Sequence, residues 1–331
     1  MTEPVAAGTD ADSGRPILVT GMPRSGTSWI GKMLDASGRV VYINEPLNPS
    51  HPPGGSPGIF PATVRPRFLY LTDENGPPFD PAFRRMLALR YGVRDELRRN
   101  RAPRDLLRLV KYWSSFARGR AHGRRALVDD PFATLAAEWV ARRFGCRVVV
   151  VVRHPAAVVS SRKRLGHTID FGHLLSQTLL VRDWLEPFRG ELEAQRSGRI
   201  DVVAQGCLLW RVLHHVVAGQ LARGAPFLVV RHEDLAADPV ARFAELYTAL
   251  ELPYTERVRD AVLAASTGGR STRAHAWSIS RTGISRTGFR PLASAEHARA
   301  WRQDLTREEI ERVRALTGDV AARFYDDAEW E

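Results

Sequence analysis

The clearest pattern along the chain is a series of short apolar runs separated by longer amphipathic stretches. Five runs have the length and the Val, Ile and Leu content of buried strands, and they lie within residues 15–21, 39–46, 125–131, 146–155 and 225–235. Segments with helical periodicity lie between them, at 25–38, 132–145 and 156–223. This alternation predicts an α/β fold, with a doubly wound parallel sheet of about five strands and helices on both faces.

Residues 47–125 interrupt this alternation. A Pro- and Gly-rich passage at 46–66 is typical of a loop. From about Pro81 to Gly123 the pattern becomes helical and rich in arginine, with a break at Pro103. We therefore expect a single domain at 15–331 that carries a variable loop and a basic helical cap at 47–125 on the acceptor side. Residues 1–14 are expected to form a disordered lead.

The amino-acid composition indicates which kinds of partner the protein favours and in which cell compartment it is expected. The 331 residues carry a net charge of +11, which favours anionic partners such as nucleic acid, acidic lipid or phosphorylated and sulfated small molecules. Cys146 and Cys207 are the only cysteines, too few for a disulfide framework. Because the first residues also lack the basic and apolar regions of a signal peptide, the expected location is the cytoplasm.

The stretch VTGMPRSGTSWI follows the first apolar run and has the glycine spacing of a phosphate-binding loop. Gly21 and Gly26 match G-x-x-x-x-G-K-[ST], but Thr27 stands where that motif has lysine. Backbone N–H groups, the positive end of the next helix and nearby hydroxyls can still hold one phosphate. Lys32 lies a helical turn too far along to reach a γ-phosphate, which disfavours an ATPase or a kinase. The alternative is a glycine-bearing turn without a ligand.

A second candidate anion site follows the fourth apolar run. Arg153 comes directly after the valines and Pro155 starts a helix that carries Ser161. Carboxyl ends of parallel strands meet at one edge of the sheet, so Arg153 is expected in the same crevice as the first loop. A guanidinium there can bind a phosphate through two hydrogen bonds. The alternative is a structural ion pair.

Taken together, PRSGTSW and VVRHPAAVVSSR resemble the 5′-phosphosulfate loop and the 3′-phosphate motif of sulfotransferases that use 3′-phosphoadenosine 5′-phosphosulfate (PAPS). The similarity is closer to the carbohydrate-type and bacterial enzymes than to the cytosolic ones, and it extends to VVRHEDLAADP and WRQDLTREEI. The resemblance implies a P-loop-like fold, PAPS as co-substrate, no metal, and in-line transfer of a sulfuryl group to a hydroxyl. Such a donor needs two separate anion sites and no lysine for a γ-phosphate.

The resemblance also implies roles for individual residues. Arg24 matches the cation beside the bridging oxygen of the phosphosulfate, where charge grows as the bond to sulfur breaks. Trp29 matches an adenine-stacking residue, with a core aromatic as the alternative. The loop donors are expected to be Ser25, Gly26, Thr27 and Ser28, and the 3′-phosphate ligands Arg153, Ser161 and Arg162.

The acceptor hydroxyl needs a general base. Glu45, at the end of the second apolar run, matches the glutamate of the family's FEPL segment and can take the acceptor proton. The alternative role for Glu45 is to order the Pro-rich loop. Asp130 is the rival base, and His51 is a weaker third candidate.

A tandem repeat, ISRTG, occupies residues 279–288. It falls where the resemblance places an arginine- and glycine-rich loop over the 3′-phosphate, so Arg281 and Arg286 are alternative ligands.

The cap mixes aromatic residues with arginines, which favours an amphipathic acceptor: a carbohydrate, a glycolipid or a glycosylated natural product. It also allows a peripheral contact with a membrane surface. Two other functions compete with this prediction, a P-loop kinase with a degenerate loop and a basic nucleic-acid-binding protein. The second lacks an aromatic platform or a recognition motif, so no nucleic-acid partner is expected.

Overall fold

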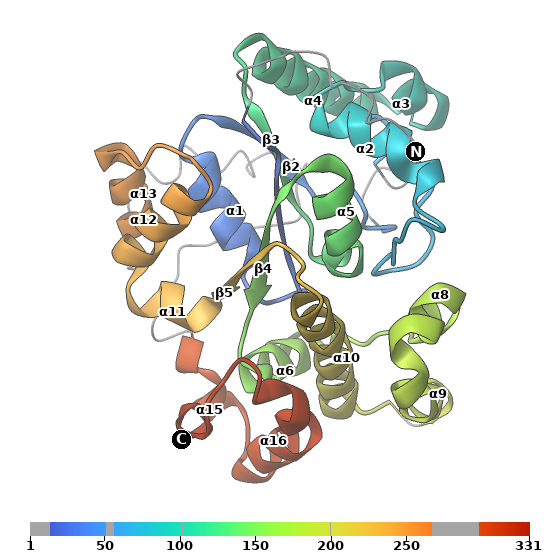
Figure 1. Cartoon of the computed structure of the whole chain (residues 1–331), viewed down its shortest axis with the longest axis vertical. Helices are drawn as coiled ribbons and strands as arrows, with labels where there is room; N and C mark the ends of the chain where they lie inside the picture. Colours follow the sequence, from blue (N-terminus) through green and yellow to red (C-terminus); the bar gives the residue numbers. More distant parts are fainter. Residues whose placement is uncertain (1–13, 51–55, 101, 199, 267–297) are drawn as a thin grey trace.

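The computed structural model describes residues 14–50, 56–100, 102–198, 200–266 and 298–331. Its centre is a parallel sheet of five strands in the order β2-β3-β1-β4-β5 (Figure 1). The strands are β1 (Ile17–Gly21), β2 (Val40–Asn44), β3 (Arg125–Asp129), β4 (Arg147–Val152) and β5 (Phe227–Arg231). Each lies within one of the five apolar runs, so the predicted sheet is confirmed.

The strand order reverses direction at the boundary between β1 and β4. After β1 the chain forms β2 and β3 on one side of β1, and then crosses over to form β4 and β5 on the other side. Gly21 is in register with Val151, so the loops that follow β1 and β4 leave the same edge side by side. Open α/β sheets bind their ligands at such a switch point, outside the carboxyl ends of the strands.

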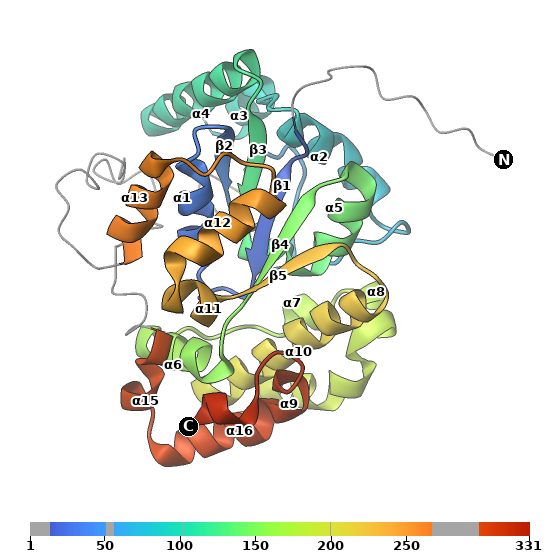
Figure 2. The same cartoon turned by 60° about the vertical axis from the view of Figure 1, so that its left-hand side comes forward.

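Helices cover both faces of the sheet, as predicted, and the strands alternate between two cores. Leu18, Val148 and Val150 face one core, whereas Val19 and Val149 face the other. Helices α5, α6, α10 and α16 pack on the first face, and α1, α11, α12 and α13 pack on the second (Figures 1 and 2). The helices are α1 (Thr27–Asp35), α2 (Asp80–Leu87), α3 (Val93–Arg99), α4 (Pro103–Ala121), α5 (Ala137–Phe144), α6 (Pro155–Leu165), α7 (Gly172–Leu175), α8 (Thr178–Leu180), α9 (Arg189–Ser197), α10 (Val202–Ala222), α11 (His232–Ala237), α12 (Pro239–Ala249), α13 (Glu256–Ser266), α15 (Trp301–Asp304) and α16 (Arg307–Ala321).

Helix α10 is the one helix within the described residues that is long and apolar enough to cross a membrane. Its apolar window is 78% buried inside the protein, and Trp210, Val212 and Leu213 are completely buried. Its hydrophobicity is therefore accounted for by packing against the sheet and the neighbouring helices.

The predicted basic insertion forms α2, α3 and α4, and Pro103 is the first residue of α4, which explains the break in the pattern. These helices are part of the first core rather than a layer outside it, because Phe83, Met86 and Phe116 are at most 2% exposed. Helix α4 leads directly into β3, so its last residue lies near the amino edge of the sheet, away from the switch point (Figure 1).

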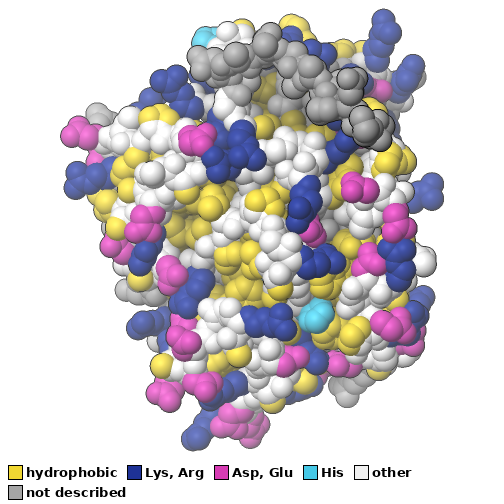
Figure 3. All heavy atoms as spheres, in the orientation of Figure 1, with side chains coloured by type: hydrophobic (Ala, Val, Ile, Leu, Met, Phe, Trp, Pro, Cys, Tyr) yellow, Lys and Arg dark blue, Asp and Glu magenta, His cyan; other side chains and the backbone are white. Residues whose placement is uncertain are grey.

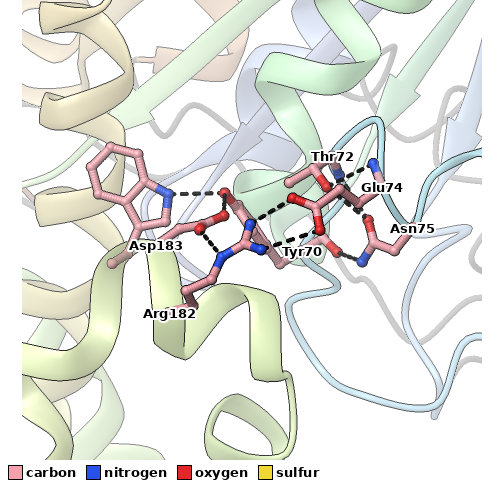
Figure 4. A network of polar contacts seen from close by, with 7 residues as sticks. Tyr70, Thr72, Glu74, Asn75, Arg182 and Asp183 are labelled. Atoms are coloured by element: carbon pink, nitrogen blue, oxygen red, sulfur yellow. Dashed lines mark hydrogen bonds and ion pairs between the residues drawn. The ribbon is translucent and has the colours of Figure 1, made fainter.

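The loop between β2 and α2 returns toward the other half of the protein and is fixed there by polar contacts (Figure 4). The Tyr70 hydroxyl donates to Asp183 (3.0 Å) and accepts from Trp184 Nε1 (3.0 Å). Arg182 pairs with Glu74 at 2.7 Å. Residues 70–75 are therefore held against the turn Val181–Leu185 that follows α8.

Candidate active site

The loop between β1 and α1 depends on both of its glycines. Gly21 has φ 153°, and a Cβ there would lie 2.3 Å from the Val151 carbonyl oxygen. Gly26 has φ 100°, and a Cβ there would lie 2.5 Å from His232 Nδ1. Both distances are far below van der Waals contact, so any side chain would push the loop off the ends of β4 and β5. Glycine is therefore required at both positions, because the loop backbone lies too close to its neighbours for a side chain.

The loop presents the start of α1 at the carboxyl edge of the sheet. The first-turn N–H groups of a helix have no partner within the helix and favour an anion. The Ser25 hydroxyl is completely buried and lacks a hydrogen-bond partner among the described residues. Ser25 and the Thr27 and Ser28 amides therefore suit a bound phosphate, as predicted for this loop.

The carboxylate of Asp129, at the end of β3, lies close to α1. It accepts from the Tyr42 hydroxyl, and a Cβ on Gly31 of α1 would lie 3.2 Å from the Asp129 Cβ. Burial raises the pKa of Asp129, and hydrogen bonding to Tyr42 opposes the rise. The sequence did not single out Asp129, which packs against α1, and contacts from the Thr27 and Ser28 hydroxyls to the donor stay a prediction.

Arg24 and Arg153 bring the two predicted anion sites into direct contact. Arg24 Nε donates to the Ser161 hydroxyl at 3.0 Å, although the two residues are 137 positions apart. Arg153 donates to the Arg24 carbonyl oxygen at 3.0 Å. Arg24 also adopts a left-handed backbone conformation with φ 81°, which is uncommon for a residue other than glycine. Residues from both motifs thus meet at the switch point, where the loops after β1 and β4 leave the sheet.

Arg153 is only 6% exposed and is positioned by three other elements. Its carbonyl oxygen accepts from Trp210 Nε1 at 2.9 Å. Glu233, at the start of α11, accepts from the His154 amide (3.0 Å) and the Tyr325 hydroxyl (2.9 Å). Burial lowers the pKa of Arg153 and the nearby Arg24 adds to this effect, while Glu233 opposes it. A second guanidinium this close makes the edge favourable for anions.

Arg162 lies one residue beyond Ser161 and is 4% exposed. Its guanidinium donates to the His167 carbonyl oxygen at 2.9 Å. Burial lowers the pKa of Arg162 to about 10, and Arg67 adds to the effect. The pKa of His167 is lowered by burial first, and the charges of Arg162, Arg24 and Arg67 add to the effect. Sequence reasoning missed Arg67 and His167, because each lies in a loop with no motif of its own.

Glu45 follows β2 and has a left-handed backbone conformation (φ 45°). Its carboxylate accepts from Asn48 Nδ2 at 2.7 Å. Burial raises the pKa of Glu45, and the negative charge of Asp129 adds to the rise. The side chain is only partly buried. It has one oxygen available besides the bond to Asn48, which suits a proton acceptor.

The rival carboxylate, Asp130, is completely buried and both of its oxygens are engaged. They accept from the backbone N–H groups of Leu47 (2.6 Å) and Phe132 (2.8 Å). Burial raises the pKa of Asp130 well above its ordinary value. These contacts give Asp130 a structural role that joins the loop after β2 to the turn after β3.

Trp29 is 6% exposed and lies on the inner face of α1. Its ring packs edge-on against His232 (centroids 5.4 Å apart) and Phe243 (5.3 Å), within the second core. These contacts agree with the core alternative that the sequence left open. Adenine stacking by Trp29 stays a prediction.

Three predicted site residues lie outside the described residues. They are His51 and the two arginines of the tandem repeat, Arg281 and Arg286. Most of the predicted lead, residues 1–13, lies outside them as well.

The protein has a P-loop-like α/β fold, and Thr27 of its β1 loop stands where nucleotide triphosphatases have a lysine. A sulfotransferase family model matches residues 16–256, and the chain belongs to the sulfotransferase family. It is therefore an enzyme of the transferase class.

Several solved sulfotransferase structures are similar to this chain. A sulfotransferase domain from the curacin biosynthetic pathway is 14% identical, with 91% of this chain and 96% of that chain covered and a TM-score of 0.45. Sulfotransferase STF9 from Mycobacterium avium is 19% identical, with coverages of 95% and 78% and a TM-score of 0.43. Mouse sulfotransferase SULT7A1, in complex with PAP, is 11% identical, with coverages of 94% and 84% and a TM-score of 0.41. No curated protein sequence matches this chain.

Proposed function

We propose that this enzyme transfers the sulfuryl group of PAPS to a hydroxyl of a carbohydrate, a glycolipid or a glycosylated natural product. The observation that carries the donor assignment is the contact between the two anion motifs. Arg24 of the β1 loop bonds to Ser161 of the β4 motif, and Arg153 bonds to the Arg24 carbonyl oxygen. A donor with one phosphate at its 5′ position and another at its 3′ position matches two such sites at adjoining strand ends.

In the proposed reaction, Glu45 and Arg24 have separate roles at the carboxyl edge of the sheet. Glu45 accepts the proton of the acceptor hydroxyl while the acceptor oxygen forms its bond to sulfur. The bond between sulfur and the bridging oxygen breaks, and the released 5′-phosphate oxygen carries the resulting negative charge. Arg24 stabilises that charge, because its two terminal nitrogens remain available beyond the Nε bond to Ser161. The products are the sulfated acceptor and 3′-phosphoadenosine 5′-phosphate (PAP).

The loop between β2 and α2 is the proposed binding region for the acceptor. Arg67 influences both Arg162 and His167 electrostatically, so this loop comes close to the proposed donor site. The next residue, Phe68, packs against Phe132 with ring centroids 5.3 Å apart. A cation beside an aromatic cluster suits an acceptor with apolar and polar parts. Phe83 of α2 and Phe116 of α4 do not support it, since both belong to the core.

We also propose that the enzyme works without a divalent metal and is located in the cytoplasm. We expect the enzyme to need no divalent metal, because two guanidinium groups take the place of a metal clamp on the donor. We also expect it in the cytoplasm, a reducing compartment in which the buried thiols of Cys146 and Cys207 would stay free.

Titration calorimetry with PAP and with ATP tests the donor class against the kinase alternative. PAP should bind at least about tenfold more tightly than ATP, since one charge-assisted contact to the 3′-phosphate contributes about 1.5–3 kcal/mol. EDTA should leave the PAP affinity unchanged. Tighter binding of ATP in the presence of magnesium, abolished by EDTA, would instead support a kinase.

A further inference from the structure

Helix α4 exposes a stripe of large apolar side chains, Leu106, Leu107, Val110 and Trp113. Their exposed fractions are 44%, 68%, 57% and 50%, which is unusual for residues of this size. Their spacing along the helix places them on one face. Leu97 of the neighbouring α3 is 40% exposed as well.

The opposite face of α4 attaches the helix to the protein. Phe116 is 1% exposed in the first core, and Tyr112 packs against that core. Gly119 lies so close to β2 that a Cβ there would be 2.2 Å from a Val41 methyl carbon. The helix is therefore held firmly by one face, and its exposed stripe is a stable feature of the protein surface.

Cations surround this stripe, and exposed carboxylates do not balance them. Among the described residues, no ion pair involves the cations at the rim of the stripe: Arg94, Arg98 and Arg99 of α3, and Lys111, Arg118 and Arg120 of α4. The carboxylates of α3 and α4 are turned inward or engaged. Glu96 is 3% exposed, Asp105 is 9% exposed, and Asp95 pairs with Arg85 at 3.3 Å.

Some dark-blue cationic and yellow apolar side chains are visible at the upper edge of Figure 3, the end of the protein at which Figure 1 places α3 and α4. We name the four stripe residues of α4 with these surrounding cations the α4 surface. It joins two chemistries on one helix face: apolar side chains that favour leaving water and cations that favour an anionic partner.

We propose that the α4 surface docks the enzyme on an anionic phospholipid membrane. A bilayer supplies both complements at once, with anionic headgroups for the cations and an acyl boundary for the leucines and Trp113. Tryptophan is enriched at the membrane interface, and a helix with this charge pattern lies in the plane of that interface. A second copy of the chain would bring like charges together, and a nucleic acid would leave the leucines exposed to water.

Docking in this way leaves the active edge uncovered. Helix α4 runs into the amino end of β3, whereas Arg24 and Arg153 follow the carboxyl ends of β1 and β4. Figures 1 and 2 accordingly show α4 and α6 at opposite ends of the protein. The α4 surface would therefore hold the enzyme at a membrane with its active edge directed away from it. This inference does not rest on the proposed donor or acceptor.

Co-sedimentation of the full chain with lipid vesicles tests the proposal. The protein should bind vesicles in which about one-third of the phosphatidylcholine is replaced by phosphatidylglycerol, and should not bind pure phosphatidylcholine. Raising the salt from about 0.1 M to about 1 M shortens the Debye length from about 10 Å to about 3 Å and should weaken binding strongly.

Two double variants locate the surface. Leu107→Ser with Trp113→Ser should weaken binding about tenfold or more, because the inserted apolar area is lost. Arg118→Glu with Arg120→Glu should weaken it about 30-fold or more, since each cation near an anionic surface strengthens binding about fivefold. All four side chains belong to exposed positions, so the fold should be retained, which a thermal melt can check.

Matched controls are Ile200→Ser, which changes an apolar residue 63% exposed elsewhere, and Arg307→Glu, whose side chain is 92% exposed on α16. Neither control should affect binding. The proposal is overturned if the wild-type chain ignores anionic vesicles, or if both double variants bind like the controls. If the wild-type chain self-associates but binds no vesicles, and the double variants no longer self-associate, a second copy of the chain occupies the α4 surface instead.

Discussion

Replacing Glu45 by glutamine is expected to lower turnover about 10²- to 10⁴-fold, the usual contribution of a general base, with little change in PAP affinity. Glutamine keeps the size of the side chain, and its amide oxygen can accept the hydrogen bond that Asn48 Nδ2 donates. It removes only the ability to take a proton. Turnover in donor-saturated assays and calorimetry with PAP measure the two quantities separately.

The matched control is Asp130→Asn. Because both oxygens of Asp130 accept from backbone N–H groups, this change should lower thermal stability more than it lowers the turnover of the folded enzyme. If Glu45→Gln keeps normal turnover while Asp130→Asn abolishes it in a folded protein, the assignment of the base is wrong and Asp130 takes its place.

The pH dependence gives a second readout of Glu45. Burial raises the pKa of Glu45 above its ordinary value of 4.5. A base must be deprotonated to act, so activity should be present above this raised pKa and should fall as the pH drops through it. The acid limb of kcat/KM should therefore lie above pH 4.5 and should be absent from the residual activity of Glu45→Gln.

Replacing Arg24 by alanine should lower turnover about 10²- to 10³-fold, as removal of a group that stabilises transition-state charge does. Donor affinity should fall much less, because the charge on the bridging oxygen develops only as the bond to sulfur breaks. Arg24→Lys should recover part of the turnover by restoring the positive charge.

Arg164→Ala is the control for Arg24, because Arg164 lies close enough to lower the pKa of Arg24 but pairs with Asp304 at 3.3 Å. Its loss should leave turnover nearly normal. A fall in PAP affinity for Arg24→Ala, with full turnover at donor saturation, would reduce Arg24 to a binding residue.

The sheet and the two motifs could be predicted from sequence because their signals are local. A run such as Val148 to Val152 is apolar at every position only if both faces are covered, which identifies a central strand. The glycines of the β1 loop mark close backbone contacts that no other residue allows. Parallel pairing then brings Arg24 and Arg153 to the same edge, whatever the length of chain between them.

Other features depend on tertiary contacts that the sequence does not encode locally. The sequence allowed Trp29 to face either adenine or the core, and its neighbours His232 and Phe243 come from a distant part of the chain. The basic helical segment was predicted as a cap on the acceptor side. Phe83, Met86 and Phe116 nevertheless lie in the first core, while a stripe of apolar residues on α4 stays exposed among the arginines. Arg67 comes close to Arg162 only because residues 70–75 are fixed against the turn after α8.

The two strand-end motifs are proposed to bind one donor through its 5′ and 3′ phosphates. The most direct measurement is the ratio of the affinities for PAP and for adenosine 5′-phosphate, determined by calorimetry in the wild-type enzyme and in Arg153→Ala. The wild-type enzyme should prefer PAP by about 10- to 100-fold, the contribution of about 1.5–3 kcal/mol from a charge-assisted contact. Arg153→Ala should lose most of that preference while its affinity for adenosine 5′-phosphate stays nearly unchanged. Equal affinities for the two ligands in the wild-type enzyme, or a preference that survives the loss of Arg153, would contradict the account.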